Sequence, residues 1–121
     1  MTTLSQWSRP ALERRVREVI AKSLHEDPGT VIMGARLVEG LDVGPTDLLD
    51  IMHELGKAFG LTIIKADYVA LLTPGPEAVR MMQADTSPGR REAIFDRHPD
   101  YFMSPTVGDI CTALEKRLAG D

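Results

Sequence analysis

The sequence predicts a small protein that is almost entirely α-helical. In three separate stretches, apolar residues recur at the 3.6-residue spacing of a helix, and helix start and stop signals bracket each stretch. A third observation is that only 5% of the residues are aromatic, so the core must be mostly aliphatic. We expect a single domain over residues 1–121, with its core formed by residues 8–72 and 104–119.

The first helix is expected over residues 8–23. Ser8 is a suitable N-cap, and Pro10 lies in the first turn, where a missing N–H is not needed. Residues 1–7 are expected to be a loose leader. A loop packed into the core by Val31, Ile32 and Met33 should follow the helix. The apolar stripe of this helix consists of Leu12, Val16, Val19 and Ile20.

The second helix is expected at Pro45–Phe59. Pro45 presets the backbone angle of the first turn, and Asp47 and Asp50 place carboxylates near the positive end of the helix dipole. Gly60 can adopt the left-handed conformation that ends a helix. One apolar stripe runs along the whole segment: Leu48, Met52, Leu55 and Phe59.

The remaining helices are shorter or later in the chain. Residues 65–72 are expected to form a short helix, and residues 105–118 a longer one that begins with a capping box of Thr106 and Asp109. Between them, residues 73–103 contain two further helical pieces, at Pro76–Ala84 and 89–97, separated by a Ser-Pro-Gly break. The stripe of the last helix comprises Val107, Ile110, Cys111, Leu114 and Leu118.

Composition excludes several classes of function. The net charge of −4 and the pI near 5.3 argue against a nucleic-acid or anionic-membrane surface. Cys111 is the sole cysteine, which excludes an internal disulfide and is typical of a reducing compartment; with no apolar run long enough to span a membrane, we expect a cytoplasmic protein. No metal site is expected because the histidines lack ligand spacing, and no catalytic constellation indicates an enzyme. The histidines are His25, His53 and His98.

The region around the second helix resembles the acyl carrier proteins. Leu24, Val31 and the run LVEGLD at residues 37–42 precede this helix at the spacings found in that family, and the resemblance extends without a gap across the first two helices. It implies a four-helix bundle in which residues 65–72 form the third helix and residues 105–118 the fourth. Residues 73–103 are then an insertion that ordinary carriers lack.

The same resemblance implies that the prosthetic group has been lost. In the family, a serine at the start of the second helix carries 4′-phosphopantetheine, and the equivalent residue here is Pro45, which has no hydroxyl. Thr46 has one, but it stands one residue later, about 100° around the helix. We therefore expect no cofactor. The alternative is a working carrier in fatty-acid, lipid or polyketide-type biosynthesis, loaded at an unusual residue such as Thr46.

Carriers dock their partner enzymes through carboxylates along the second helix, and the resemblance implies the same here. Residues 36–63 hold a net charge of −3. Asp47 and Asp50 stand where the family has acids, whereas Gly56 and Lys57 replace acids of the family. We expect a non-catalytic module that docks a protein with a basic patch. The alternatives are a merely solvated helix face, or a binding site in residues 73–103. The expected docking residues are Asp47, Asp50, Met52, His53 and Glu54.

Overall fold

The computed structural model describes residues 7–120, which are mostly helical. The expected loose leader therefore falls almost wholly outside the described residues, except for Trp7, whose ring packs against Phe59 with 4.8 Å between ring centroids. Two 3₁₀ turns, η1 (Pro28–Thr30) and η2 (Pro99–Tyr101), accompany the α-helices. The α-helices are α1 (Arg9–Leu24), α2 (Pro45–Phe59), α3 (Lys65–Val69), α4 (Pro76–Ala84), α5 (Arg90–Arg97) and α6 (Val107–Leu118).

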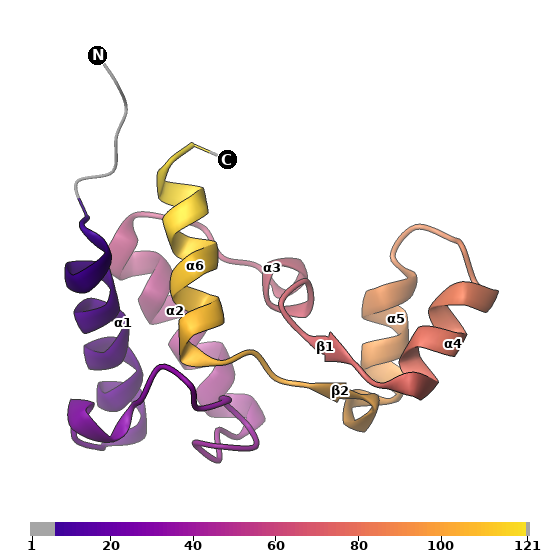
Figure 1. Cartoon of the computed structure of the whole chain (residues 1–121), viewed down its shortest axis with the longest axis horizontal. Coiled ribbons are helices and arrows are strands. Elements are labelled where there is room, and N and C mark those ends of the chain that lie inside the picture. Colours follow the sequence, from indigo (N-terminus) through magenta and orange to yellow (C-terminus); the bar gives the residue numbers. More distant parts are fainter. Residues whose placement is uncertain (1–6, 121) are drawn as a thin grey trace.

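Helices α1, α2 and α6 form one half of the molecule, which we call the bundle (Figure 1). Helix α1 packs against both α2 and α6, so its apolar stripe is covered on two sides. Val16 and Ile20 are fully buried there, together with Cys111 from α6. This packing of amphipathic stripes confirms the periodicity read from the sequence.

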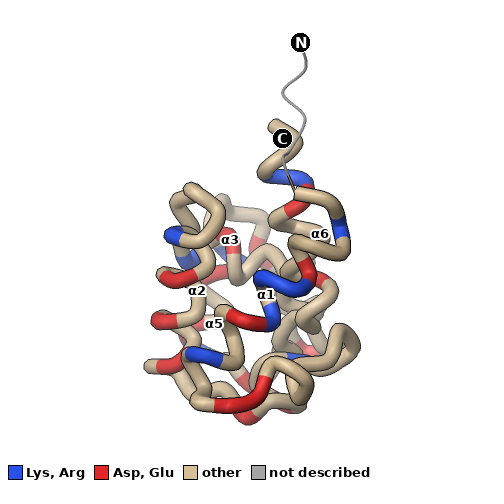
Figure 2. The backbone as a smooth tube through the Cα atoms, turned by 90° about the vertical axis from the view of Figure 1, so that its left-hand side faces the viewer, with Lys and Arg blue, Asp and Glu red and all other residues tan. Residues whose placement is uncertain are grey.

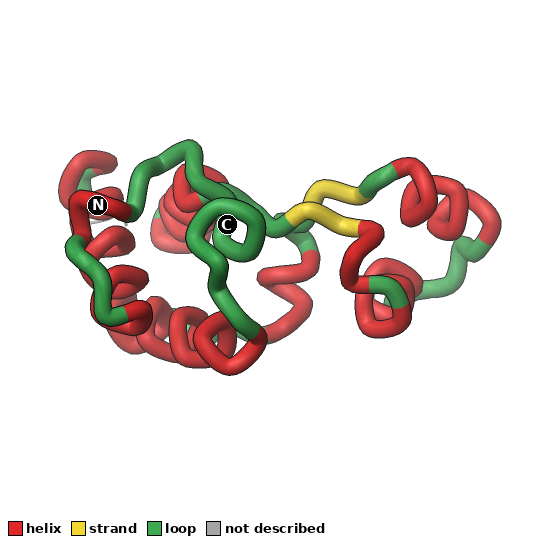
Figure 3. The backbone as a smooth tube through the Cα atoms, turned by 90° about the horizontal axis from the view of Figure 1, so that it is seen from below, coloured by secondary structure: helices red, strands yellow, loops and turns green. Residues whose placement is uncertain are grey.

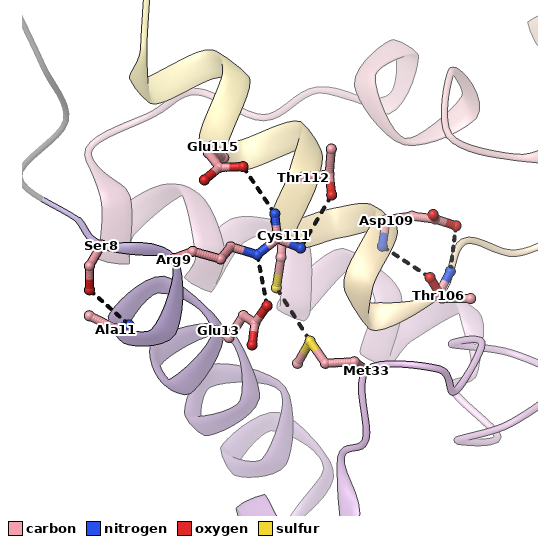
Figure 4. Close-up of polar contacts among 10 residues, drawn as sticks. All are labelled: Ser8, Arg9, Ala11, Glu13, Met33, Thr106, Asp109, Cys111, Thr112 and Glu115. Carbon is pink, nitrogen blue, oxygen red and sulfur yellow. Dashed lines mark hydrogen bonds and ion pairs between the residues drawn. The ribbon is translucent and has the colours of Figure 1, made fainter.

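Polar contacts also join α1 to α6 (Figure 4). The guanidinium of Arg9 binds Glu13 on its own helix at 2.8 Å and Glu115 on α6 at 3.0 Å. Helix α6 begins with the predicted capping box, in which Thr106 and Asp109 bond reciprocally to each other's backbone N–H at 3.0 Å. Each of these contacts fixes a helix end or the spacing between two helices.

Residues 65–103 form the other half, which we call the distal unit: α3, α4, α5, η2 and two short strands. The strands β1 (Thr73–Pro74) and β2 (Phe102–Met103) pair antiparallel and join the bundle side to α4 and α5 as a narrow bridge (Figure 3). The backbone N–H of Gly75 extends the bridge by donating to the carbonyl of Tyr101 at 2.8 Å. The expectation of an all-helical chain missed this sheet, because two-residue strands are too short to show an alternating pattern.

Several predicted boundaries need correction. Helices α2 and α4 begin and end as expected, but α3 ends at Val69 instead of residue 72, and α5 begins at Arg90 because Gly89 takes a left-handed conformation before it (φ 78°). In the loop after α1, Val31 is buried, whereas Ile32 is 60% exposed, so only part of the predicted apolar run packs into the core. That α1, α2, α3 and α6 form a carrier-type four-helix bundle stays a prediction.

Charge is distributed unevenly over the bundle (Figure 2). Helix α1 is rich in arginine, while carboxylates predominate along α2. Among the helices of residues 7–120, none combines the length and the apolar character that crossing a membrane would require.

Candidate functional site

The start of α2 is the position where the sequence predicted a lost attachment site. Gly44 is the N-cap with an extended backbone (φ −82°, ψ 172°), and it has no side chain with which to cap the helix. Pro45 is the first helical residue and Thr46 the second, and both are exposed. Free N–H groups at such a helix start favour an anion. Pro45, at the first helical position, has no hydroxyl to which a phosphate group could be attached.

The carboxylates of α2 make few contacts that stabilise the fold. Within residues 7–120, the side chains of Asp47 and Asp50 make no hydrogen bond and no ion pair. Glu54 has only a loose ion pair with Lys57 at 3.8 Å, between two partly exposed side chains. Because exposed pairs of this kind contribute little to stability, all three carboxylates can bind a partner at small cost to the fold.

The five predicted docking residues do not form one patch. At 100° per residue, Met52 lies about 140° around α2 from Asp47, on the opposite flank of the helix. Asp47 and Glu54 are half-buried on one flank, while Asp50 and His53 are exposed. Met52 instead lines a groove on the other flank. The structure therefore separates the acidic residues from the apolar member of the set.

This groove lies between α2, α3 and α6 and has a volume of about 750 Å³. Its α2 wall is the apolar stripe at positions i, i+3, i+4 and i+7, which explains why Leu48 and Met52 are only half-buried although they belong to that stripe. Apolar clefts of this size commonly hold ligands or partner side chains. The residues that form its apolar surface are Leu37, Leu48, Ile51, Met52, Leu55, Ile63, Leu71, Ile110 and Leu114.

Polar groups sit at the edges of the groove. Arg117 of α6 reaches across to Asp67 of α3 at 3.5 Å and also donates to the carbonyl of Thr62 at 3.1 Å. Tyr68 lines the groove from α3, and burial together with the negative charge of Glu39 raises the pKa of Tyr68 to about 12. Tyr68 therefore remains a neutral phenol at neutral pH.

Gly56 explains one departure of α2 from the carrier pattern. It is buried, and a Cβ at this position would stand 2.6 Å from the carbonyl oxygen of Leu61. The chain turns back tightly here, because the N–H groups of Gly60 and Leu61 both donate to the carbonyl of Gly56. An acidic side chain cannot fit in this turn, so the acidic row of α2 ends at Glu54.

Cys111 is a core residue, as the sequence predicted. It is fully buried, and burial raises the pKa of its thiol to about 11, so almost no thiolate is available as a nucleophile or ligand. Its sulfur lies 4.0 Å from that of Met33 (Figure 4). Among the described residues, no group of three or more potential ligands is arranged to hold a metal ion.

Sequence reasoning missed a polar junction around Ser104, a residue that is only 3% exposed. Its hydroxyl donates to Glu39 at 2.7 Å and accepts from the backbone N–H of Val38 at 2.9 Å, and its carbonyl accepts from Arg36 at 2.6 Å. Glu39 is therefore held by the fold and is no docking residue. The sole signal in the sequence is a serine between apolar neighbours, since the partners lie more than sixty residues earlier.

Comparison with known proteins does not assign this chain to a family. No family model matches the sequence, and no solved structure matches it.

Proposed function

We propose that this protein is a non-catalytic docking module related to the acyl carrier proteins, and that the acidic face of α2 binds a protein with a basic patch. The observation that carries the proposal is the freedom of Asp47 and Asp50, whose carboxylates stand on the first turns of α2 with no partner in the described part of the chain. Charges that the fold does not use are available to a partner.

Two further features support this reading. The order of helices, with a long first helix, a loop, α2, a short α3 and a late α6, is the order that the resemblance implies. Pro45 is the first residue of α2 and stands where the resemblance puts the attachment residue, which supports a module without 4′-phosphopantetheine. The partner would be steered by the carboxylates of α2, because complementary charge mainly raises the rate of encounter.

The groove beside α2 supplies the apolar part of such an interface. Met52 lies in its wall. Leu49, about 60° around α2 from Met52, is 64% exposed. Interfaces combine a desolvated apolar centre with a polar rim. We propose that the partner contacts the exposed residues Asp50 and His53 and places an apolar side chain next to Met52.

A second candidate is a working carrier loaded at Thr46. One observation favours it: the hydroxyl of Thr46 is exposed on the first turn of α2, near the free N–H groups that would bind a phosphodiester. The residue stands about 100° from the position that the resemblance assigns to the attachment serine. The docking module is the better proposal, because it requires no unusual recognition by a modifying transferase.

The docking proposal is tested by reversing charge on α2. For a partner isolated by affinity capture, Asp47→Lys with Asp50→Lys should slow association by about an order of magnitude or more and flatten its salt dependence, because the steering field is reversed. Stopped-flow association measured at several salt concentrations gives both quantities.

The matched control is Glu77→Lys with Asp100→Lys. These exposed acids belong to the distal unit, so the change in net charge is identical but its place differs. Equal slowing by both double variants would mean that only net charge matters. Slowing by the control alone would move the binding site to the distal unit, and either result would contradict the proposal.

A further inference from the structure

Helix α3 is the part of the distal unit that forms a wall of the groove, and it packs on the rest of that unit through α5. Among the described helices, α5 is the one that packs most closely on α3. The groove lies between α3 and the two bundle helices α2 and α6. Helix α3 therefore has two interfaces, one with α5 and one with the bundle, and they differ in how closely they are packed.

The interface with the distal unit is closed by specific bonds. Arg91 of α5 donates from Nε to the carbonyl of Val69 at 2.9 Å and from Nη2 to the carbonyl of Leu72, which satisfies the end of α3. Lys65 at the start of α3 pairs with Asp96 of α5. Aromatic rings fill the space between them: Tyr68 meets Phe95 at 6.4 Å, and Phe95 meets Phe102 at 5.7 Å.

Among residues 7–120, one ion pair joins α3 to the bundle. Arg117 and Asp67 stand 3.5 Å apart, and their side chains are 36% and 41% exposed. An exposed pair of this kind is weak and is screened by salt. Apart from it, the groove between them is mostly apolar: Met52 and Leu71 are only half-buried, whereas Tyr68 of α3 is buried in the core that both halves share.

The chain passes between the two halves at only two places. Residues 60–64 lead from α2 to α3, and they begin at Gly60 in the left-handed conformation (φ 68°). Residues 103–104 lead from β2 back to the bundle, where Ser104 is fixed to the loop before α2. Both places are short connections next to a fixed point, which is where hinges lie.

We infer that the distal unit moves as one body about these two connections, and that this movement opens and closes the groove between α2, α3 and α6. The ion pair of Arg117 and Asp67 stabilises the closed arrangement of the groove. A ligand or partner side chain in the groove selects the position of the distal unit that accommodates it, because it favours one member of an existing set of conformations. Contact with α4 or α5 changes the groove in return, since such coupling is reciprocal.

Residual dipolar couplings of the backbone amides test this directly on the full chain. The couplings of α3, α4 and α5 should fit one alignment tensor, smaller in magnitude than the tensor that fits α1, α2 and α6. Asp67→Asn should reduce the distal tensor further, because it removes the charge facing Arg117. An asparagine oxygen can still accept the bond from the N–H of Ile64 that Asp67 accepts at 2.9 Å.

Asp96→Asn is the matched control, since it breaks an ion pair inside the distal unit and should leave the ratio of the two tensors unchanged. The methyl groups of Met52 and Leu71, on opposite walls of the groove, should show relaxation dispersion with the rate found for α4 amides, while Met33 should not. The inference is overturned if one tensor fits all six helices in both the wild type and Asp67→Asn. It is also overturned if α3 follows the bundle tensor, or if the groove methyl groups show no exchange.

Discussion

The bundle and the distal unit are held together in different ways. In the bundle, long helices bury continuous apolar stripes, and residues such as Val16, Ile20 and Leu55 are almost fully buried. In the distal unit the helices are short and bury fewer residues, such as Ile94 and Phe102, and Arg91 adds bonds to two backbone carbonyls and lies over the ring of Phe102 at 5.7 Å. From this difference we expect the distal unit to open at a lower free energy than the bundle.

The largest effect is expected for Leu55→Ala in the bundle. Leu55 is 3% exposed, and removing a buried leucine side chain should lower the free energy of unfolding by roughly 2–5 kcal/mol. Leu49→Ala, on the same helix, is the control: this side chain is 64% exposed, and its loss should cost less than about 0.5 kcal/mol. Urea denaturation measures both values, and equal losses would contradict the burial of the stripe.

A smaller and local effect is expected for Arg91→Met in the distal unit. Losing two charge-assisted hydrogen bonds should lower the opening free energy of α3 and α5 amides by about 1.5–3 kcal/mol, because the end of α3 loses its partners. Native-state hydrogen exchange resolves this helix by helix. Arg80→Met, an exposed arginine of α4, should change little. Equal acceleration in α1 would show that the two halves unfold together, contrary to the comparison.

How much of this could be read from the sequence differs between the halves. The cap at Thr106, the burial of Cys111 and the burial of Leu55 and Phe59 follow from local spacing, and the structure confirms them. The predicted stripe of α2 left out Ile51, which is fully buried, and included Leu48 and Met52, which are only half-buried. Other contacts join residues far apart in the chain, so no local sequence pattern predicts them. They are the strand pairing, the Ser104 junction and the contacts of Arg91.

The candidate site could also be predicted only in part from the sequence. The exposure of Asp50 and His53 follows from their place on the polar side of α2. That Met52 lies in a groove depends on where α3 packs, and that Glu39 is held by Ser104 depends on the return of β2. Both features depend on tertiary packing, which the spacing of residues along a helix does not reveal.

Alkaline pH should destabilise both halves at once, so it separates them least. Burial raises the pKa of Cys111 from 9.0 to about 11 and that of Tyr68 from 10.0 to about 12, so the folded state holds these protons more tightly than the unfolded state. Their contribution is fully present below pH 9 and is lost as the pH rises through the folded-state pKa values. Tyr68→Phe should lessen the loss between pH 10 and 12, and a denaturation series against pH would reveal it. An unchanged pH dependence would contradict the buried position of the phenol.

We propose that α2 is a carrier-type helix whose attachment motif is lost at Gly44 and Pro45, and restoring these two residues is the direct test. Pro45→Ser supplies the hydroxyl at the position indicated by the resemblance. Gly44→Asp supplies the preceding aspartate, and it fits because a Cβ at Gly44 meets nothing within 4 Å. An aspartate there can also cap the helix, as the glycine cannot.

The measurement is the intact mass of each protein after co-expression with a broad-range phosphopantetheinyl transferase. We expect no mass increase for the wild type and the increase of one phosphopantetheinyl group for the double variant Gly44→Asp/Pro45→Ser, because a hydroxyl at the first helical position decides whether the group can be attached. A modified wild type, with the group mapped to Thr46 or Ser87, would show that the protein is a working carrier. An unmodified double variant would contradict the resemblance of α2 to the carrier helix.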